Sequence, residues 1–278
     1  MRLLKQFGAV AVVAFAGSLA VGAVGGNAWL TLILGVATAV LCVLTYAWVV
    51  RRTERRPVTE VARAGAVAAT ARGVLLGVGL FAAVIANIAM LGGYRVVGWG
   101  SAVATVGTLG FMVAAAVTEE LIFRGVLFRI VEERIGTWWA LALTGLLFGL
   151  SHLLNEHASL WGAIAIAVEA GGMLAAAYAA TRSLWVPIGL HFGWNFAEAG
   201  IFGTVVSGKD GSQGLLDGAM SGPTLLGGGD FGPEASLYSV LAGVLTATVF
   251  LVLAHRRGRL VPRRRRAAVA GSADTLAR

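Results

Sequence analysis

Long apolar stretches separated by short polar segments constrain the fold of this chain more than any other feature. Of its 278 residues, 58% are hydrophobic and 13% are charged, whereas soluble domains carry about 25% charged residues. A stretch of about 20 apolar residues is long enough to cross a bilayer as a helix. We therefore predict an all-α, polytopic integral membrane helical bundle with about eight transmembrane helices. The predicted spans are 7–24, 28–50, 73–93, 102–128, 138–155, 159–181, 184–204 and 236–254.

These spans divide the chain into five predicted segments. They are the first three spans (1–100), a core of four spans that carries the polar motifs (101–204), a Gly-rich external loop (205–235), the last span (236–255) and a polybasic tail (256–278). The loop is more typical of a flexible connector than of a lid. The first span could instead be a signal peptide, but its apolar run is long and its cleavage site is weak.

Basic residues fall in alternate loops. They are Arg2, Lys5, Arg51, Arg52, Arg55, Arg56, Arg63, Arg72, Arg129, Arg134, Arg182 and the cluster from Arg256 onward. Because cytoplasmic loops carry an excess of Lys and Arg, this pattern predicts that both termini are cytoplasmic, in a plasma membrane protein. The net charge of +8 then reflects the flanks of the spans, and no nucleic-acid partner is predicted. The tail is expected to lie on anionic lipid headgroups.

Small residues recur four positions apart in two of the spans. Gly73 and Gly77 lie in the third span, and Gly189 and Gly193 lie in the seventh. Such spacing allows two membrane helices to approach closely.

Strongly polar residues interrupt three of the spans. They are Glu119, Glu120, His152, His191 and Asn195. Placing an ionisable group inside a bilayer costs about 3 kcal/mol on insertion scales, so such residues usually mark a functional site. Glutamates, histidines and an amide together suggest hydrolysis.

The two adjacent glutamates are expected to have different roles. Glu120 and Arg124 are four residues apart and in the favourable order for a helical ion pair, so Glu120 is predicted to be a scaffold. Glu119 has no local partner, and burial then favours its neutral form. A carboxylate of that kind suits a general base that activates water.

Counting residues along the helices predicts that the polar groups meet. Glu119 lies 17 residues before Gly136, and His152 lies 16 after it. At 1.5 Å of rise per residue, the two side chains reach the same height in an antiparallel helix pair. His191 lies nine residues past Arg182, which predicts a site reached from the cytoplasm, the side of the basic loops. Asn195 and Glu198 continue the helix face of His191, and Glu198 is a candidate supporting residue.

The three motifs together resemble a known family. They read Glu119-Glu120-x-x-x-Arg124, Phe148-x-x-x-His152 and His191-x-x-x-Asn195. In this order they are similar to the CPBP intramembrane proteases, which include type II CAAX prenyl proteases and bacteriocin-processing and lysostaphin-resistance-like proteins. The resemblance covers about 85 residues, 113–195.

The resemblance implies an intramembrane endopeptidase that cleaves a membrane-anchored protein or peptide. It implies that Glu119, helped by His152, is the base that takes a proton from a water molecule. It also implies that His191 and Asn195 stabilise the oxyanion or orient the water. Glu120 and Arg124 would be structural. The substrates implied are prenylated C-termini in the eukaryotic branch or bacteriocin-like peptides in the bacterial one.

The need for a metal stays open at this point. Glu119, His152 and His191 could form a three-ligand zinc site with an open water position. The chain lacks the His-Glu-x-x-His pattern of familiar zinc proteases, and a His–Asn pair four apart makes better hydrogen-bond donors than zinc ligands. The residues therefore favour a metal-free site slightly, whereas the metalloprotease label of the family favours zinc.

Other functions were weighed against proteolysis. A non-catalytic peptide-binding or bacteriocin-immunity membrane protein of the same fold would tolerate loss of Glu119. A transporter could use Glu119 and Glu169 as a proton relay, but the chain has no paired interrupted helices in two similar halves. Glu119, Glu120 and Arg124 alone would suggest a structural ion pair. The complete motif set favours the protease.

Overall fold

A computed structural model describes residues 1–209 and 214–263. The part of the predicted polybasic tail from 264 to 278 lies outside the described residues. The first helices are α1 (Arg2–Ala23), α2 (Ala28–Glu54), η1 (Thr59–Val61), α3 (Ala66–Met90), α4 (Ala102–Glu120), η2 (Leu121–Phe128) and α5 (Arg129–Ile135). The middle helices are α6 (Thr137–Ser151), η3 (His152–Leu154), α7 (Leu160–Ile166), η4 (Ala167–Gly172), α8 (Met173–Thr181), α9 (Trp185–Asn195) and η5 (Phe196–Ile201). The last elements are α10 (Thr224–Gly227), η6 (Gly229–Phe231), η7 (Pro233–Ala235) and α11 (Leu237–Arg256), with strands β1 (Tyr94–Trp99) and β2 (Leu216–Met220).

The predicted all-α membrane bundle is confirmed. Within the part of the chain that the structure describes, seven helices are long and apolar enough to cross a membrane. One of them joins α4, η2 and α5 into a single helix, Ala102–Ile135, which extends beyond the predicted span. The seventh predicted span, 184–204, forms α9 and η5, which end at Ile201 and are together shorter than these seven helices. The protein is an integral membrane protein.

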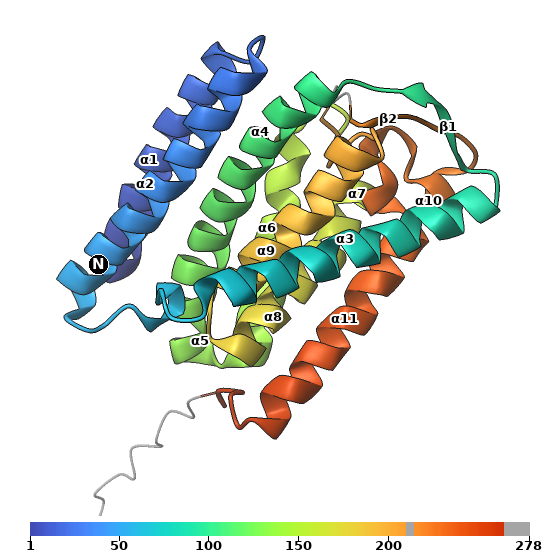
Figure 1. The fold of residues 1–278 in the computed structure, drawn as a ribbon. Coiled ribbons are helices and arrows are strands. Elements are labelled where there is room, and N and C mark those ends of the chain that lie inside the picture. The colour runs from blue at the N-terminus through green and yellow to red at the C-terminus, as the bar shows by residue number, and fades with distance from the viewer. Residues whose placement is uncertain (210–213, 264–278) are drawn as a thin grey trace, which may run out of the picture.

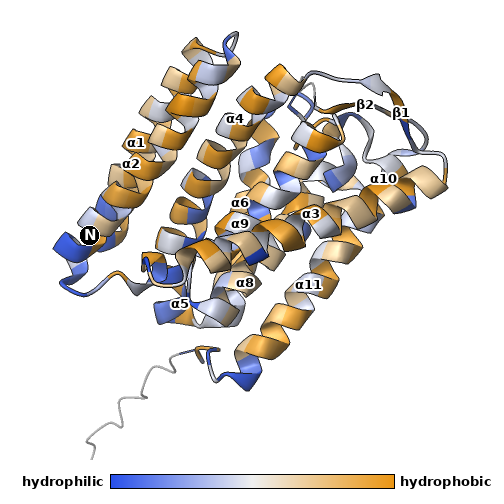
Figure 2. Ribbon diagram, in the orientation of Figure 1, coloured by the Kyte–Doolittle hydropathy of each residue, from blue (hydrophilic) through white to orange (hydrophobic). Residues whose placement is uncertain are grey.

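The outer surface of the bundle is apolar. Large side chains such as Phe15, Trp48, Leu75 and Leu245 are more than half exposed, and Figure 2 shows hydrophobic residues along the outer helices α1, α2, α3 and α11. Contiguous exposed apolar surface of this extent is unfavourable in water and marks contact with lipid.

The helices pack around α4 and α9. The α1–α2 pair lies against one side of α4, α3 crosses α9, and α11 packs on α8 (Figure 1). The α3–α9 contact is formed by the predicted small-residue pairs. A Cβ added at Gly189 would lie 2.2 Å from the carbonyl oxygen of Thr70, and one added at Gly77 would lie 2.3 Å from that of Leu190. Only glycine allows these two backbones to approach so closely.

Polar side chains cap the N-termini of the helices that start at one end of the bundle. Asn27, Ser101, Ser159 and Ser236 accept hydrogen bonds from backbone N–H groups in the first turns of α2, α4, α7 and α11. Each cap satisfies a donor that the helix leaves without an internal partner. This end also holds the ribbon formed by β1 and β2.

The ribbon differs from the sequence prediction. β1 pairs antiparallel with β2, and a bulge interrupts the register between Val96 and Gly98. Gly100 and Ser101 continue the pairing through backbone hydrogen bonds to Leu215 and Gly214. The prediction of a flexible connector over 205–235 is therefore wrong for residues 214–221, because their backbone pairs with the loop between α3 and α4.

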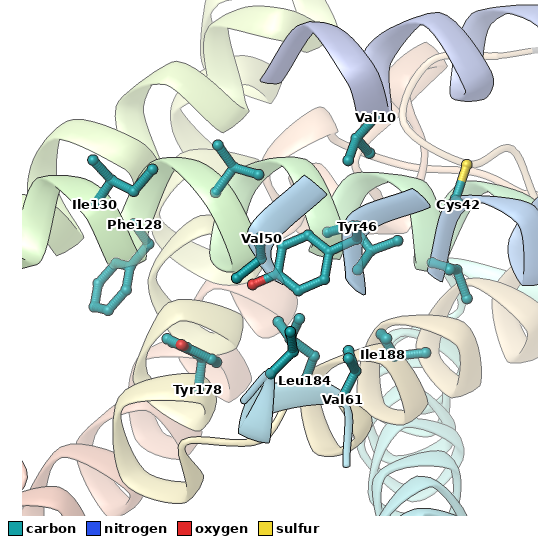
Figure 3. Packing of buried hydrophobic residues seen from close by; sticks show 14 of the residues in the cluster. Val10, Cys42, Tyr46, Val50, Val61, Phe128, Ile130, Tyr178, Leu184 and Ile188 are labelled. Atoms are coloured by element: carbon teal, nitrogen blue, oxygen red, sulfur yellow. The ribbon is translucent and has the colours of Figure 1, made fainter. Parts of the chain in front are cut away.

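A buried core lies at the opposite end, around Tyr46 (Figure 3). Its ring is fully buried among apolar side chains that include Val50 and Leu184. The Tyr46 hydroxyl lies 2.8 Å from Oε1 of Glu60 and 3.0 Å from the carbonyl oxygen of Gly125, which are both acceptors. Gly125 belongs to η2, so this core holds the helix that carries the first motif.

Candidate active site

The acidic pair ends α4, and its two side chains have different environments. The side chain of Glu119 is 31% exposed, whereas that of Glu120 is completely buried. Adjacent residues on a helix point about a quarter turn apart, so one carboxylate can face a cavity while the other faces the core.

Arg124 is buried and links three parts of the site. Its guanidinium donates to Oε1 of Glu120 at 2.7 Å, which is the ion pair that the sequence predicts. It also donates to the carbonyls of Ala170 at 2.9 Å and Gly171 at 3.3 Å. These carbonyls lie in η4, a π-helical turn, and the wider turn leaves carbonyls available to a side chain. The guanidinium carbon lies 4.5 Å from the ring centroid of Phe148.

His191 lies between the two glutamates. Its Nδ1 is 3.0 Å from Oε1 of Glu120, and its Nε2 is 3.9 Å from Oε2 of Glu119. When Nδ1–H donates to Glu120, the lone pair of Nε2 faces Glu119. Nothing in the sequence points to the contact with Glu120, because the two residues are 71 positions apart and the helical pairing of Glu120 with Arg124 accounts for that carboxylate.

His152 follows α6 and is oriented through its own helix. Its Nδ1 lies 2.8 Å from the carbonyl oxygen of Phe148, so Nε2 is the nitrogen left for other contacts. The ring of Phe148 lies 4.9 Å from that of His152 and 6.1 Å from that of His191, measured between centroids. Phe148 thus packs against both histidines and the arginine, which explains why the second motif pairs a phenylalanine with a histidine.

A cavity of about 670 Å³ connects the exposed members of the three motifs. Glu119, His152 and Asn195 all line it, and His191 lies behind Glu119, 5% exposed. The predicted convergence of the motifs is therefore present in the structure. A cavity of this volume is within the range of ligand-binding sites.

The direction of the cavity differs from the sequence prediction. Its walls continue to Gly25, Gly26, Ser101 and Lys209, at the end of the bundle where the polar caps lie. The expectation that the site is reached from the side of the basic loops is wrong for this cavity. The count along α4 and α6 predicts the relative height of Glu119 and His152, but it could not show which end of the space between helices is open.

Glu198 lies in a different environment from the other motif residues. It is completely buried in η5, and its carboxyl is close to those of Glu169 and Glu234. Glu234, which belongs to none of the three motifs, accepts a hydrogen bond from the hydroxyl of Ser207 at 2.5 Å. These three glutamates form a buried group beside the site. Among the described residues, no hydrogen bond joins the carboxylate of Glu198 to His191 or Asn195.

The residues were also compared with the requirements of a metal site. Within 1–209 and 214–263, no group of three or more His, Cys, Asp and Glu side chains is arranged so that it could hold a metal ion. His191 directs one ring nitrogen to Glu120, and His152 directs one to a backbone carbonyl. These contacts hold each ring through Nδ1, as the outer partners of catalytic and of metal-ligating histidines both do, and leave the two Nε2 atoms facing the site.

The site residues fall within a segment that matches a known family. Residues 100–197 match the model of the Rce1-like family, described as type II CAAX prenyl endopeptidase Rce1-like. The resemblance to CPBP proteases is confirmed over this segment. The Rce1-like segment begins just before α4 and includes Glu119, His152, His191 and Asn195, whereas Glu198 lies one residue beyond it. Neither the curated proteins nor the solved structures include a match.

Proposed function

We propose that the protein is an intramembrane endopeptidase that hydrolyses a peptide bond of a membrane-anchored protein or peptide. The observation that carries this proposal is the division of labour within the acidic pair. Glu119 lines a cavity that also reaches His152 and Asn195, whereas Glu120 is buried and holds both Arg124 and His191. A base that reaches water and a rigid support behind it are what a hydrolytic site requires.

In the proposed mechanism, Glu119 takes a proton from a water molecule as the water oxygen bonds to the carbonyl carbon of the substrate. The carbonyl oxygen then carries the negative charge, and the amide N–H of Asn195 and the His152 ring face the cavity in which that charge develops. Donors fixed before the reaction are the usual source of such stabilisation. The C–N bond breaks, and the proton held by Glu119 passes to the leaving amine, which gives one carboxylic acid and one amine.

His191 is proposed to position Glu119 and the attacking water. Its Nε2 is 3.9 Å from Glu119, a separation that one bridging water can span. Glu120 fixes the ring through Nδ1, and Arg124 donates a hydrogen bond to the same oxygen of Glu120. Glu120 and Arg124 are therefore proposed as positioning residues, and Glu198 as a packing residue of the neighbouring buried group.

The loops that carry the arginines also indicate where the protein lies and how it is oriented. The arginine-rich loops favour a plasma membrane protein with both termini on the cytoplasmic side. The basic residues that follow α11 would then contact anionic headgroups of the inner leaflet.

The test is cleavage of membrane-tethered peptides by the purified full-length protein in detergent. Wild type is compared with Glu119→Gln, and with Glu156→Gln as a matched control, because Glu156 is exposed and outside the cavity. We expect Glu119→Gln to lose activity by about 10²–10⁴-fold, the range for a general base, and Glu156→Gln to keep it. Equal cleavage by wild type and Glu119→Gln would refute the role of Glu119.

Each reaction is repeated with a metal chelator and then with added zinc. Activity that survives chelation supports the side-chain mechanism. Activity that is lost on chelation and returns with zinc would replace it with a metal-dependent one. Binding of peptides without cleavage by wild type would instead favour the non-catalytic peptide-binding alternative.

A further inference from the structure

One end of the bundle collects almost all of the cationic side chains. Buried and exposed ion pairs join the elements at this end: Arg2 with Glu133, Arg129 with Glu54, and Arg182 with Glu132. Hydrophilic residues gather there, near the N-terminus, α5 and the end of α11 (Figure 2). The described cations of this end, together called the arginine end, are Arg2, Lys5, Arg51, Arg52, Arg55, Arg56, Arg63, Arg129, Arg134, Arg182, Arg256, Arg257, Arg259 and Arg263.

The opposite end carries few cations. Its described loops contain Arg95 and Lys209 as their basic side chains. They are balanced by four acidic side chains, Glu156, Asp217, Asp230 and Glu234. Because an excess of Lys and Arg marks the cytoplasmic loops of a polytopic protein, this asymmetry predicts that the arginine end faces the cytoplasm.

The cavity of the candidate site leads to the cation-poor end. α1 runs from Arg2 to Ala23, so Gly25 and Gly26, which line the cavity, are a full helix length from the arginine end. Ser101 lines it at the start of α4, and Lys209 lines it from the segment that follows η5. Among the described residues, none of the cations of the arginine end contributes to the lining.

Hydrogen bonds hold in place the segment that borders the mouth of the cavity at the cation-poor end. The side-chain amide of Asn155 donates to the carbonyl of Ser207 at 2.6 Å, and the backbone of His157 donates to Gly208 at 2.9 Å. The loop after α6 therefore holds the segment that carries Ser207 and Lys209 beside His152. This rim fixes the position of the mouth relative to the catalytic side chains.

We propose that the active site opens on the extracytoplasmic side of the membrane, and that its substrates are exported membrane-anchored proteins whose cleaved segment lies on that side. This inference rests on the proposed function and adds to it the sidedness and the substrate class. An extended peptide enters between the α1–α2 turn and the Lys209 segment and reaches Glu119 from there. A cytoplasmic C-terminal segment would have to cross the closed arginine end to reach the same carboxylate.

The first test measures sidedness without relying on activity. Cys42, which is buried and the only cysteine of the sequence, is replaced in the full-length chain by Cys42→Ala. Single cysteines are then introduced as Lys209→Cys at the mouth, Ala115→Cys on the cavity wall one turn before Glu119, and Arg52→Cys at the arginine end as the matched control. Each variant is treated with a membrane-impermeant charged maleimide in right-side-out and in inverted membrane vesicles.

We expect Lys209→Cys and Ala115→Cys to be labelled in right-side-out vesicles and to lose labelling in inverted ones. Arg52→Cys should show the opposite pattern. Labelling of Ala115→Cys only in inverted vesicles, together with Arg52→Cys, would overturn the proposal, because the cavity would then open to the cytoplasm. Labelling of Lys209→Cys only in inverted vesicles would overturn the orientation itself.

The second test is done in cells and uses a peptide that the purified protein cleaves in detergent. The peptide is placed on one side of the membrane or on the other. It is fused next to a membrane anchor as an exported reporter or as a cytoplasmic reporter, each with wild type and with Glu119→Gln. Cleavage of the exported reporter alone supports the proposal, and cleavage of the cytoplasmic reporter alone refutes it. Failure of the proposed function is distinguishable, because wild type would then cleave no peptide in detergent whatever the labelling pattern.

Discussion

The ring nitrogen Nδ1 of His191 lies 3.0 Å from Oε1 of Glu120, a carboxylate that is completely buried. This contact joins the first and third sequence motifs, and it gives Glu120 a second role besides its pairing with Arg124. Arg124, Glu120, His191 and Glu119 form a connected row from the core to the cavity. Polar groups that satisfy one another in this way hold side chains in one geometry.

Neutralising each of the two adjacent glutamates should therefore affect stability to very different extents. Glu119→Gln should remove activity and leave the thermal unfolding temperature in detergent nearly unchanged, because the side chain is partly exposed. Glu120→Gln should lower the free energy of unfolding by about 3–5 kcal/mol, since it leaves Arg124 as a buried charge without its partner. Thermal unfolding and peptide cleavage of both purified variants measure the contrast. Equal loss of stability in the two would show that the burial difference does not matter.

The sequence predicted the elements that carry the motifs, because the apolar runs and the four-residue spacings are local. It predicted the Glu120–Arg124 pair for the same reason. It could not predict the contact of His191 with Glu120 or the place of Glu234, since both depend on how distant helices pack. The paired segment over 205–235 was missed because glycines permit both flexible loops and close backbone pairing, and only the partner strand decides between them.

A second prediction is that substitutions of Glu120 and Arg124 have coupled effects on the free energy of unfolding. Glu120→Leu alone should destabilise strongly, whereas Glu120→Leu combined with Arg124→Met should recover part of the loss, because no unpaired charge is left inside the bundle. Recovery should be incomplete, since Arg124 also donates to the carbonyls of Ala170 and Gly171. Activity should not return, because His191 would still lack its acceptor. A double-mutant cycle on unfolding free energies measures this coupling, and additive losses would contradict it.

A third prediction concerns the contact that places α9. Gly77→Leu should separate α3 from α9, because a side chain there would meet the carbonyl of Leu190 at 2.3 Å. That displacement moves His191 and Asn195 together, so both stability and activity should fall. Gly79→Leu on the same helix is the matched control, since a Cβ at Gly79 meets no atom within 4 Å. Similar behaviour of the two variants in thermal unfolding and cleavage would mean that close packing of these helices is not required.

The last prediction is a pH dependence that arises outside the spans, at Glu60. Burial alone would raise the pKa of this carboxyl, but hydrogen bonds from Arg56 and Tyr46 outweigh it and hold the pKa below the ordinary value of 4.5. A carboxyl whose pKa is lower in the folded state stabilises the fold above its unfolded pKa, and that stabilisation disappears as the pH falls through the folded value. Wild type should therefore unfold at a higher temperature than Glu60→Gln at neutral pH.

The gap between wild type and Glu60→Gln should shrink as the pH drops below about 4.5. The measurement is thermal unfolding of both proteins in detergent from pH 7 to pH 3, with Glu156→Gln as a control because its side chain is exposed. A gap that stays constant to pH 3 would show that the hydrogen bonds to Glu60, rather than its charge, supply the stabilisation. A shrinking gap ties the Tyr46 core, and through Gly125 the helix of the first motif, to the ionised state of one carboxylate.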